Sequence, residues 1–391
     1  MQSDKLWTAM LDEGREFLSR IVGKDRVALV FHDDCDGCCS ASIFWILLDE
    51  LHEGCEVKLF CTEEHDVVLT SRIVNELARF EPQHILCVDL PIDKDPESVH
   101  RTLKLTGAKM LSYDHHVPTT IIRHKSCIQI NPLNIDRNMK VAPPTSCFGY
   151  RLYKYMGGGK DLCWVAGTGI VADYGTETCK EEIEEIRNHY HDLYPFEEIS
   201  QSKGMQTKLM ILANLINSGY QYADRKGALL AVRAIIESID NMGPYYLLKG
   251  KSKTIQTLLL YRRKIDEEIT SRVSEFREKA DINWHMGLAF YMVSSEKYIV
   301  SELANRLSSL YPGLILFIIS SNKQRIKFSA RVGPKKGVNL DDLVKASISG
   351  IQNALGGGHR LAAGGSLPKS DLEKFIQNVT NHVRNGEKHH L

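Results

Sequence analysis

Short apolar segments that end beside acidic or imidazole side chains constrain the fold of this chain most strongly. In the N-terminal part of the sequence they predict strands at residues 26–31, 57–61, 84–90 and 109–113. Helix-like segments precede or separate these strands, at residues 4–22, 40–50 and 71–80. Apolar strands that alternate with helices predict an α/β fold with a parallel sheet covered on both faces. In such sheets the chemistry gathers at the carboxyl ends of the strands.

The strand signal fades in the middle of the chain and later returns. Apolar spacing predicts helices at residues 147–155, 162–173, 180–192, 207–218, 226–239 and 253–279. Beyond them, strands are predicted at 286–294, 314–320 and 325–331, and helices at 300–310 and 340–355. We therefore expect a parallel-sheet domain over residues 1–190, a helical insert and connector over 191–280, and a smaller α/β domain over 281–391.

The charge balance limits the partners of the chain. Lys and Arg together number 49, as do Asp and Glu, so the formal net charge is zero. A protein that coats nucleic acid would be basic overall, so any polyanion site here must be a local patch. A membrane-spanning helix needs about 18 consecutive apolar residues, and no apolar run in this sequence is that long. The N-terminal residues include acids where a signal peptide is basic and apolar, so we expect a cytoplasmic protein with no membrane association.

The ten cysteines all lie between Cys35 and Cys179. A secreted disulfide framework would not leave the rest of the chain unlinked, so reduced thiols are expected. Residues 35–39 form a C-x-x-C-C run, but no second C-x-x-C pair completes a tetrahedral zinc site. We interpret these cysteines as small packing residues.

Four segments carry acids or histidines where a site could form. These segments are His32-Asp33-Asp34-Cys35-Asp36-Gly37, then Asp89, then Asp114-His115-His116, and finally Asp173. Carboxylates packed at neighbouring strand ends repel one another unless cations lie between them. Oxygen ligands with a few imidazoles suit Mn²⁺ or Mg²⁺ better than zinc. Two such ions, about 3.5–4 Å apart, can activate water for in-line attack on phosphorus.

Each segment alone also has a simpler interpretation. A strand-end aspartate often caps the next helix or forms a turn. Paired histidines have many structural uses. An Asp-x-Asp-Gly loop could be solvated or could bind calcium, although the later glutamate of an EF-hand is missing. The combined placement of the segments at strand ends favours a metal site.

The combination resembles a known family. The H-x-D-x-D-G segment, the strand-end Asp89, the D-H-H segment and the later Asp173 resemble, in order and spacing, the DHH phosphoesterase superfamily. Residues 356–365, GGGHRLAAGG, are similar to the G-G-H-x-x-A-A-G signature of its DHH-associated C-terminal domain. The resemblance covers about residues 25–175 and 281–386. Length and architecture look like the branch of RecJ-like exonucleases and oligonucleotide phosphodiesterases.

The resemblance implies two divalent metal ions, with Mn²⁺ preferred and Mg²⁺ as the alternative. By similarity, one ion is held by His32, Asp34 and Asp89, and the other by Asp36, Asp89, His115 and Asp173. Two further residues would serve catalysis. Asp114 would orient His115 and the nearby backbone, and His116 would contact the scissile phosphate or assist the leaving oxygen.

The C-terminal region would hold the substrate. Backbone N–H groups at Gly357 and Gly358 can approach phosphate oxygens closely, and His359 and Arg360 add donors beside them. A helix C-cap followed by a flexible turn is the alternative. Residues 321–336 hold six basic residues and no acid. There Arg331 matches, by similarity, a strand that lines the substrate cleft, although a solvated strand face is also compatible.

The predicted function is metal-dependent hydrolysis of single-stranded DNA or RNA from an end, because a narrow cleft admits a single strand and excludes a duplex. Replication or repair proteins are the partners that the resemblance implies. Three alternatives stay open. They are a small-nucleotide enzyme acting on nano-RNA, phosphoadenosine phosphate or a cyclic dinucleotide, a manganese pyrophosphatase, and an inactive replication scaffold. The sequence leaves the polarity of digestion and the oligomeric state undetermined.

Overall fold

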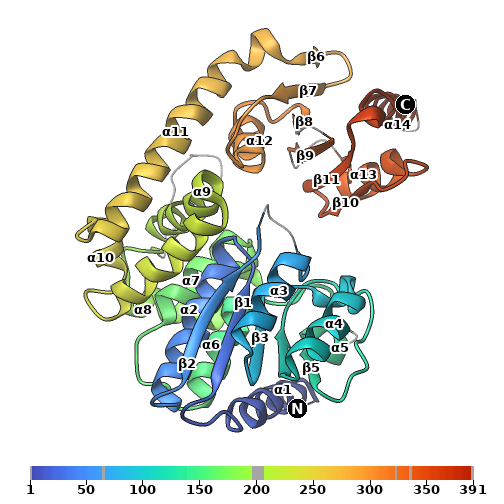
Figure 1. Cartoon of the computed structure of the whole chain (residues 1–391). Coiled ribbons are helices and arrows are strands. Elements are labelled where there is room, and N and C mark those ends of the chain that lie inside the picture. Colours follow the sequence, from blue (N-terminus) through green and yellow to red (C-terminus); the bar gives the residue numbers. More distant parts are fainter. Residues whose placement is uncertain are drawn as a thin grey trace. The chain divides into compact units, whose positions relative to one another are not determined.

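The computed structural model divides the chain into two compact units (Figure 1). The structure describes residues 2–63, 67–136, 138–195, 207–321, 324–333 and 337–388. The first unit includes the described residues up to Arg262, and the second begins at Arg263, inside helix α11 (Lys253–Lys279). The three-part division expected from the sequence stays a prediction. Lys323, Lys335 and Lys336 of the predicted basic segment lie outside the described residues.

The first unit is built on a five-stranded parallel sheet in the order β2-β1-β3-β4-β5. Its strands are β1 (Arg26–Phe31), β2 (Glu56–Cys61), β3 (His84–Val88), β4 (Lys109–Tyr113) and β5 (Cys127–Ile130). The parallel sheet confirms the predicted α/β fold class. The strand β5 was not expected, because its sequence CIQI is short and only partly buried.

Helices cover both faces of this sheet (Figure 1). One face packs against α3 (Ser71–Phe80) and α4 (Pro96–Thr106), which share a buried cluster with Ala28 and Val30 of β1. The other face packs against α2 (Cys35–Leu51) and α6 (Thr145–Tyr155). There the Tyr113 ring lies 5.2 Å from that of Phe44 and 4.3 Å from that of Phe148. Both layers are apolar, as expected for strands with two buried faces.

Further helices complete the first unit. They are α1 (Gln2–Leu18), α5 (Pro132–Ile135), α7 (Cys163–Ala172), α8 (Lys180–His189), α9 (Lys208–Ile239) and α10 (Pro244–Lys249). The backbone of α9 is non-helical at Ala223 and Asp224, which agrees with the prediction of two helices here. The two parts cross so closely that a β-carbon on Gly227 would lie 1.8 Å from the Gly219 carbonyl oxygen. Among the helices that the structure describes, none is both long and apolar enough to span a bilayer.

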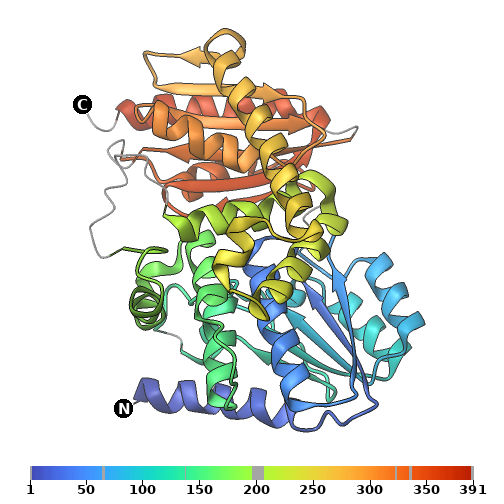
Figure 2. The ribbon, with the colours of Figure 1, turned by 90° about the vertical axis from the view of Figure 1, so that its left-hand side faces the viewer.

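The second unit contains a six-stranded mixed sheet in the order β10-β11-β9-β8-β7-β6 (Figure 2). Its elements are β6 (Asp281–Asn283), β7 (Leu288–Val293), α12 (Val300–Leu310), β8 (Ile315–Ser321), β9 (Arg325–Val332), α13 (Leu340–Ile348), β10 (Leu355–Gly358), β11 (Ala362–Pro368) and α14 (Leu372–Lys388). Only the β7–β8 pair is parallel among the described strands of this sheet. The helices α13 and α14 share one buried core with the sheet. The helix α12 packs against β8 and β9.

The glycine-rich segment corrects one expectation. The predicted helix over residues 340–355 ends at Ile348, and Gly350 follows it with a φ of +75°. The glycines then form strand β10, which pairs with β11 in an antiparallel hairpin rather than forming a helix cap and a loop. A β-carbon on Gly358 would lie 2.5 Å from the Ala362 carbonyl oxygen, so this hairpin requires glycine there.

Candidate metal centre

Three of the four predicted segments meet at the carboxyl ends of adjacent strands. His32 follows β1, Asp89 follows β3, and Asp114 follows β4. These strands are neighbours in the sheet, so the side chains beyond them converge at one edge. The fourth predicted residue, Asp173, comes directly after α7 and reaches the same edge, where its Oδ2 lies 3.5 Å from Nε2 of His115.

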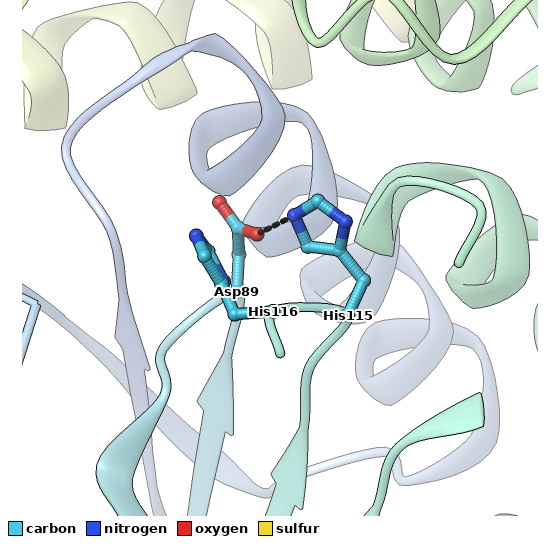
Figure 3. Close-up of side chains that lie close together, drawn as sticks. All are labelled: Asp89, His115 and His116. Carbon is cyan, nitrogen blue, oxygen red and sulfur yellow. Dashed lines mark ion pairs between the residues drawn. The ribbon is translucent and has the colours of Figure 1, made fainter. Parts of the chain in front are cut away.

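The converging side chains form overlapping sets of possible metal ligands. Within each set, the donor atoms lie within 4.8 Å of one another. Among the described residues, the sets at this edge are His32–Asp34–Asp89, Asp36–His115–Asp173 and Asp89–His115–His116. Figure 3 shows the last set, with a dashed line joining the ion pair between His115 and Asp89. Asp89 and His115 each belong to two of these sets, and of the two only Asp89 is a carboxylate with two oxygen donors.

The H-x-D-x-D-G segment positions its acids through the start of α2. Asp34 is the N-cap of this helix, and its Oδ1 accepts a hydrogen bond of 3.0 Å from the Gly37 N–H. The other oxygen, Oδ2, lies 2.9 Å from Nδ1 of His32. A β-carbon on Gly37 would lie 2.2 Å from the His32 carbonyl oxygen, so glycine is required there. The cap and the metal-ligand role are therefore compatible in the same carboxylate.

Asp89 adopts an unusual backbone conformation. Its φ is +59°, in the left-handed region that costs a non-glycine residue about 1 kcal/mol or more. A hydrogen bond of 3.0 Å from its N–H to the Tyr113 carbonyl holds this turn. The buried carboxylate then lies between two imidazoles, with Oδ1 3.4 Å from Nε2 of His115 and Oδ2 3.7 Å from Nδ1 of His32. Strain of this kind is typical of functional sites.

The start of α6 holds the Asp36 carboxylate. Oδ2 accepts a hydrogen bond of 2.8 Å from the Thr145 N–H, and Oδ1 accepts bonds from the N–H (3.1 Å) and hydroxyl of Ser146. The Thr145 hydroxyl also donates to Oδ1 of Asp89, at 3.1 Å. Neither Thr145 nor Ser146 was predicted from the sequence as part of a site. The signal that could have found them is the Pro143-Pro144 pair before a helix, whose first N–H groups are free to bind anions.

The Asp114 carboxylate contacts His116 rather than His115. Its Oδ1 lies 2.8 Å from Nδ1 of His116, and its Oδ2 accepts a bond of 3.2 Å from the His116 N–H. The expectation that Asp114 orients the His115 side chain therefore needs correction, because the short Asp-x-His spacing favours the second histidine. The His116 carbonyl also accepts a bond of 2.8 Å from Asn131. These contacts fix the His116 ring beside Asp89.

The site carries strongly shifted pKa values. Burial alone would lower the pKa of His32, but its carboxylate neighbours, chiefly Asp34, raise it well above the usual value. Burial would also lower the pKa of His115, but Asp89 and Asp173 outweigh it and raise that pKa as well. Burial raises the pKa of Asp36, and desolvation together with the nearby Asp89 and Asp34 raises that of the part-exposed Asp173 to about 6. These shifts mean that, without cations, protons supply the positive charge among the clustered acids.

Asp89 shows the opposite shift. Burial would raise its pKa, but the hydrogen bonds from His115 and His32 hold it well below the usual value. Asp89 is therefore ionised while its neighbours carry protons. At an ionised oxygen donor between imidazoles, a divalent cation can take the place of these protons.

The predicted substrate residues lie in the sheet of the second unit. Gly357 and Gly358 belong to β10, and His359 and Arg360 are exposed at the turn after it. The Gly358 N–H donates to Oδ1 of Asp341 at 3.0 Å. On β9, Arg331 pairs in register with Ala362, and its guanidinium donates to α12, at 2.9 Å to the Ser301 hydroxyl. Their role toward a substrate stays a prediction.

Comparisons with known proteins agree with this architecture. The model of the DHHA1 domain matches residues 287–385. RecJ from Thermus thermophilus, solved with Mn²⁺, aligns over 98% of this chain with a TM-score of 0.66 and 14% identity. The chain has the DHH–DHHA1 fold. This confirms the predicted resemblance, while the identity is too low to carry over a substrate.

The chain spans only part of that RecJ, 55% of its length. The same Thermus protein has also been solved with Mg²⁺ (TM-score 0.60, 14% identity, 98% of this chain and 52% of that chain). Another RecJ, bound to manganese, is matched over 98% of this chain and 94% of its own length, with 16% identity and a TM-score of 0.59. The chain is also similar in fold to an exopolyphosphatase-related protein from Bacteroides fragilis, with a TM-score of 0.52, 15% identity, and coverage of 96% of this chain and 97% of that chain. The comparison with curated proteins gave no match.

Proposed function

We propose that this protein is a divalent-metal-dependent phosphodiesterase that degrades single-stranded DNA or RNA from one end. The observation that carries the proposal is the convergence of carboxylates and imidazoles around the buried Asp89 at the edge of the parallel sheet. The fold shared with RecJ proteins that were solved with Mn²⁺ or Mg²⁺ supports both the metals and the reaction. Replication or repair proteins are the partners that we propose on the same likeness.

The donor set fits two divalent cations of the Mn²⁺ or Mg²⁺ type. His32, Asp34 and Asp89 would hold one ion, and Asp36, Asp89, His115 and Asp173 the other. Within these sets all donors are carboxylate oxygens or imidazole nitrogens, which these ions prefer. When bound, the cations would supply a polarised water and neutralise charge on the phosphate.

The Asp114–His116 pair would handle the proton. Nδ1 of His116 is held by Asp114, so the other ring nitrogen is left to exchange a proton with the substrate. The His116 side chain is 31% exposed, whereas that of Asp114 is buried. The imidazole is thus accessible to a phosphate and keeps a fixed orientation, as a general acid for the leaving oxygen requires.

The second unit would bind the strand. Lys327 and Arg331 alternate on β9 and so share one face of it, and the exposed His359 and Arg360 follow the glycine strand. Cationic and N–H donors of this kind bind a phosphate backbone without reading its sequence. Sequence-independent contacts are what an exonuclease needs as its substrate shortens.

The test is hydrolysis of end-labelled single strands. Purified protein with Mn²⁺ is given DNA or RNA labelled at the 5′ or the 3′ end, with unlabelled dinucleotide as competitor. We expect a metal-dependent ladder that shortens from one end and is lost in Asp89→Asn. The variant Asp95→Asn is the control, because Asp95 only caps α4 and asparagine also caps.

Other outcomes would replace the proposal. Strong preference for the dinucleotide would indicate a small-nucleotide phosphodiesterase or phosphatase. Turnover of pyrophosphate alone would indicate a pyrophosphatase. Absence of any metal-dependent hydrolysis by the folded wild type would favour an inactive scaffold.

A further inference from the structure

A second group of possible metal ligands lies at the opposite end of α7 from Asp173. Cys163 is the first residue of α7, Asp161 lies two positions earlier, and His189 is the last residue of α8. Their donor atoms all lie within 4.8 Å of one another. The Sγ atom of Cys163 lies 3.9 Å from Nδ1 of His189. Nothing in the proposed phosphodiesterase reaction uses these residues.

The distances suit a tetrahedral zinc ion. With Zn–S of about 2.3 Å and Zn–N of about 2.0–2.1 Å, a tetrahedral angle places the sulfur and nitrogen about 3.6 Å apart. The observed 3.9 Å needs only a small adjustment. The thiol is buried, while Asp161 and His189 are exposed, so an ion could reach the group from solvent.

The carboxylate of Asp161 is already held in place between the two helix ends. Oδ1 accepts a hydrogen bond of 3.2 Å from the Cys163 N–H, and Oδ2 accepts one of 2.8 Å from the Tyr190 hydroxyl. Contacts of this kind orient metal ligands in known sites. They tie the acid both to the residue that carries the thiol and to the neighbour of His189.

Among the described residues of the first unit, a second thiol-containing group is less suited to hold a cation. Cys147, Cys179 and Glu182 also lie within 4.8 Å of one another. However, the Glu182 carboxylate forms a two-point ion pair with Arg151, at 2.8 and 3.1 Å. A guanidinium beside the ligands already supplies the positive charge, so this group does not favour a cation.

We propose that Asp161, Cys163 and His189 form a zinc site with water as the fourth ligand. Sites with three protein ligands and one water are common for zinc, and these three ligand types all occur in them. The ion would join the start of α7 to the end of α8. Because Asp173 comes directly after α7, zinc would stabilise the helix that delivers this acid to the metal centre. The proposal does not depend on the proposed phosphodiesterase function.

Cobalt provides a test that separates this site from the metal centre. Co²⁺ bound by a thiolate has a charge-transfer absorption in the near ultraviolet, which a site with only oxygen and imidazole donors cannot give. We expect wild-type protein to develop this band to the level of one thiolate per chain, and Zn²⁺ to abolish it. Cys163→Ser should lose the band, and Cys147→Ser, the matched control from the other thiol group, should keep it.

His189→Ala provides a second measurement at an exposed position, where the fold tolerates substitution. It should weaken the affinity for Co²⁺, measured from the same band, by about 10-fold or more. Loss of a residue that only orients a metal ligand already lowers metal affinity by about this factor. A wild-type protein without the band, or a band that persists in Cys163→Ser, would overturn the proposal. Unchanged Co²⁺ affinity in His189→Ala would overturn it as well.

Discussion

Gly169 of α7 faces Asp36 of α2 so closely that a β-carbon built on Gly169 would lie 2.6 Å from Oδ1 of Asp36. The same β-carbon would lie 2.2 Å from the Ser146 hydroxyl oxygen, which donates to that carboxylate. The Asp36 side chain is buried and held by the start of α6, so it cannot move aside freely. The absence of a side chain at Gly169 is therefore required for the Asp36 carboxylate to keep this position.

Gly169→Ala should destabilise the protein and weaken metal binding. An extra carbon in a packed interior typically costs about 1–3 kcal/mol, measured here as the free energy of unfolding in urea. The displaced Asp36 should also lower Mn²⁺ affinity in a calorimetric titration. Gly159→Ala is the control, because a β-carbon there meets nothing within 4 Å. Equal behaviour of the two variants would contradict the packing that we describe.

Glu182→Gln should strongly reduce stability. The Glu182 side chain is 2% exposed and pairs with Arg151, so its neutralisation leaves a largely buried guanidinium without its counter-charge. Loss of one partner of a buried pair costs about 3–5 kcal/mol. In the control, Glu177→Gln, the pair with Lys180 is 87% and 76% exposed, and a change below about 0.5 kcal/mol is expected. Similar unfolding free energies for both variants would show that the Arg151 pair is not buried.

The stability of the metal-free protein should depend on pH through Asp173. Its pKa rises from 3.8 to about 6 on folding, because the surrounding protein desolvates the carboxyl group and Asp89 and Asp34 lie nearby, although the side chain stays 43% exposed. The folded state therefore binds this proton more tightly than the unfolded chain, and its contribution to stability falls as pH rises from about 4 to about 6. Asp173→Asn should remove this part of the slope. An identical pH dependence of unfolding in the two proteins would contradict the shift.

Metal affinity should change with pH in the opposite direction. The raised pKa values of His32 and His115 mean that both imidazoles must release protons before they can ligate a cation. Mn²⁺ affinity should rise with pH through neutrality, by about tenfold per pH unit for each proton released. Calorimetry in buffers of different ionisation enthalpy counts those protons. Affinity that is constant between about pH 6 and pH 8 would be incompatible with imidazole ligands.

His116→Gln should reduce turnover and largely preserve metal binding. Glutamine cannot exchange a proton at neutral pH, so loss of general acid catalysis should lower kcat about 10²–10⁴-fold on a single-stranded substrate. Asp114→Asn should lower kcat less, because it disturbs only the orientation of the ring. A His116→Gln protein with wild-type kcat would exclude His116 from the proton transfer.

Sequence patterns predicted the strands and helices in which the order of apolar and polar residues reflects which side chains are buried. The strand at Arg26–Phe31 and the helix at Ser71–Phe80 were predicted with these ends, because apolar runs and periodicity mark them. The strand at Leu355–Gly358 was missed, since three of its four residues are glycines and carry no pattern of burial. Helix propensity also did not show that helix α13, which precedes this strand, ends at Ile348.

The residues of the candidate site also fall into those that the sequence could predict and those that it could not. His32, Asp89 and His115 could be predicted because each follows an apolar strand, and adjacent parallel strands bring their ends together. Thr145 and Gly169 could not, because their importance arises from contacts with Asp89 and Asp36, which are far away in the sequence. Such residues are ordinary in composition and become informative only when the helices are packed.

A titration of Mn²⁺ into the metal-free protein tests the central claim most directly. The concentration of free Mn²⁺ is measured by electron paramagnetic resonance. Wild-type protein should bind two ions per chain at the metal centre, and Asp95→Asn should bind them equally well. Asp89→Asn should lose tight binding of both ions, because Asp89 contributes to both proposed ligand sets. Two ions bound by Asp89→Asn with wild-type affinity would contradict the account.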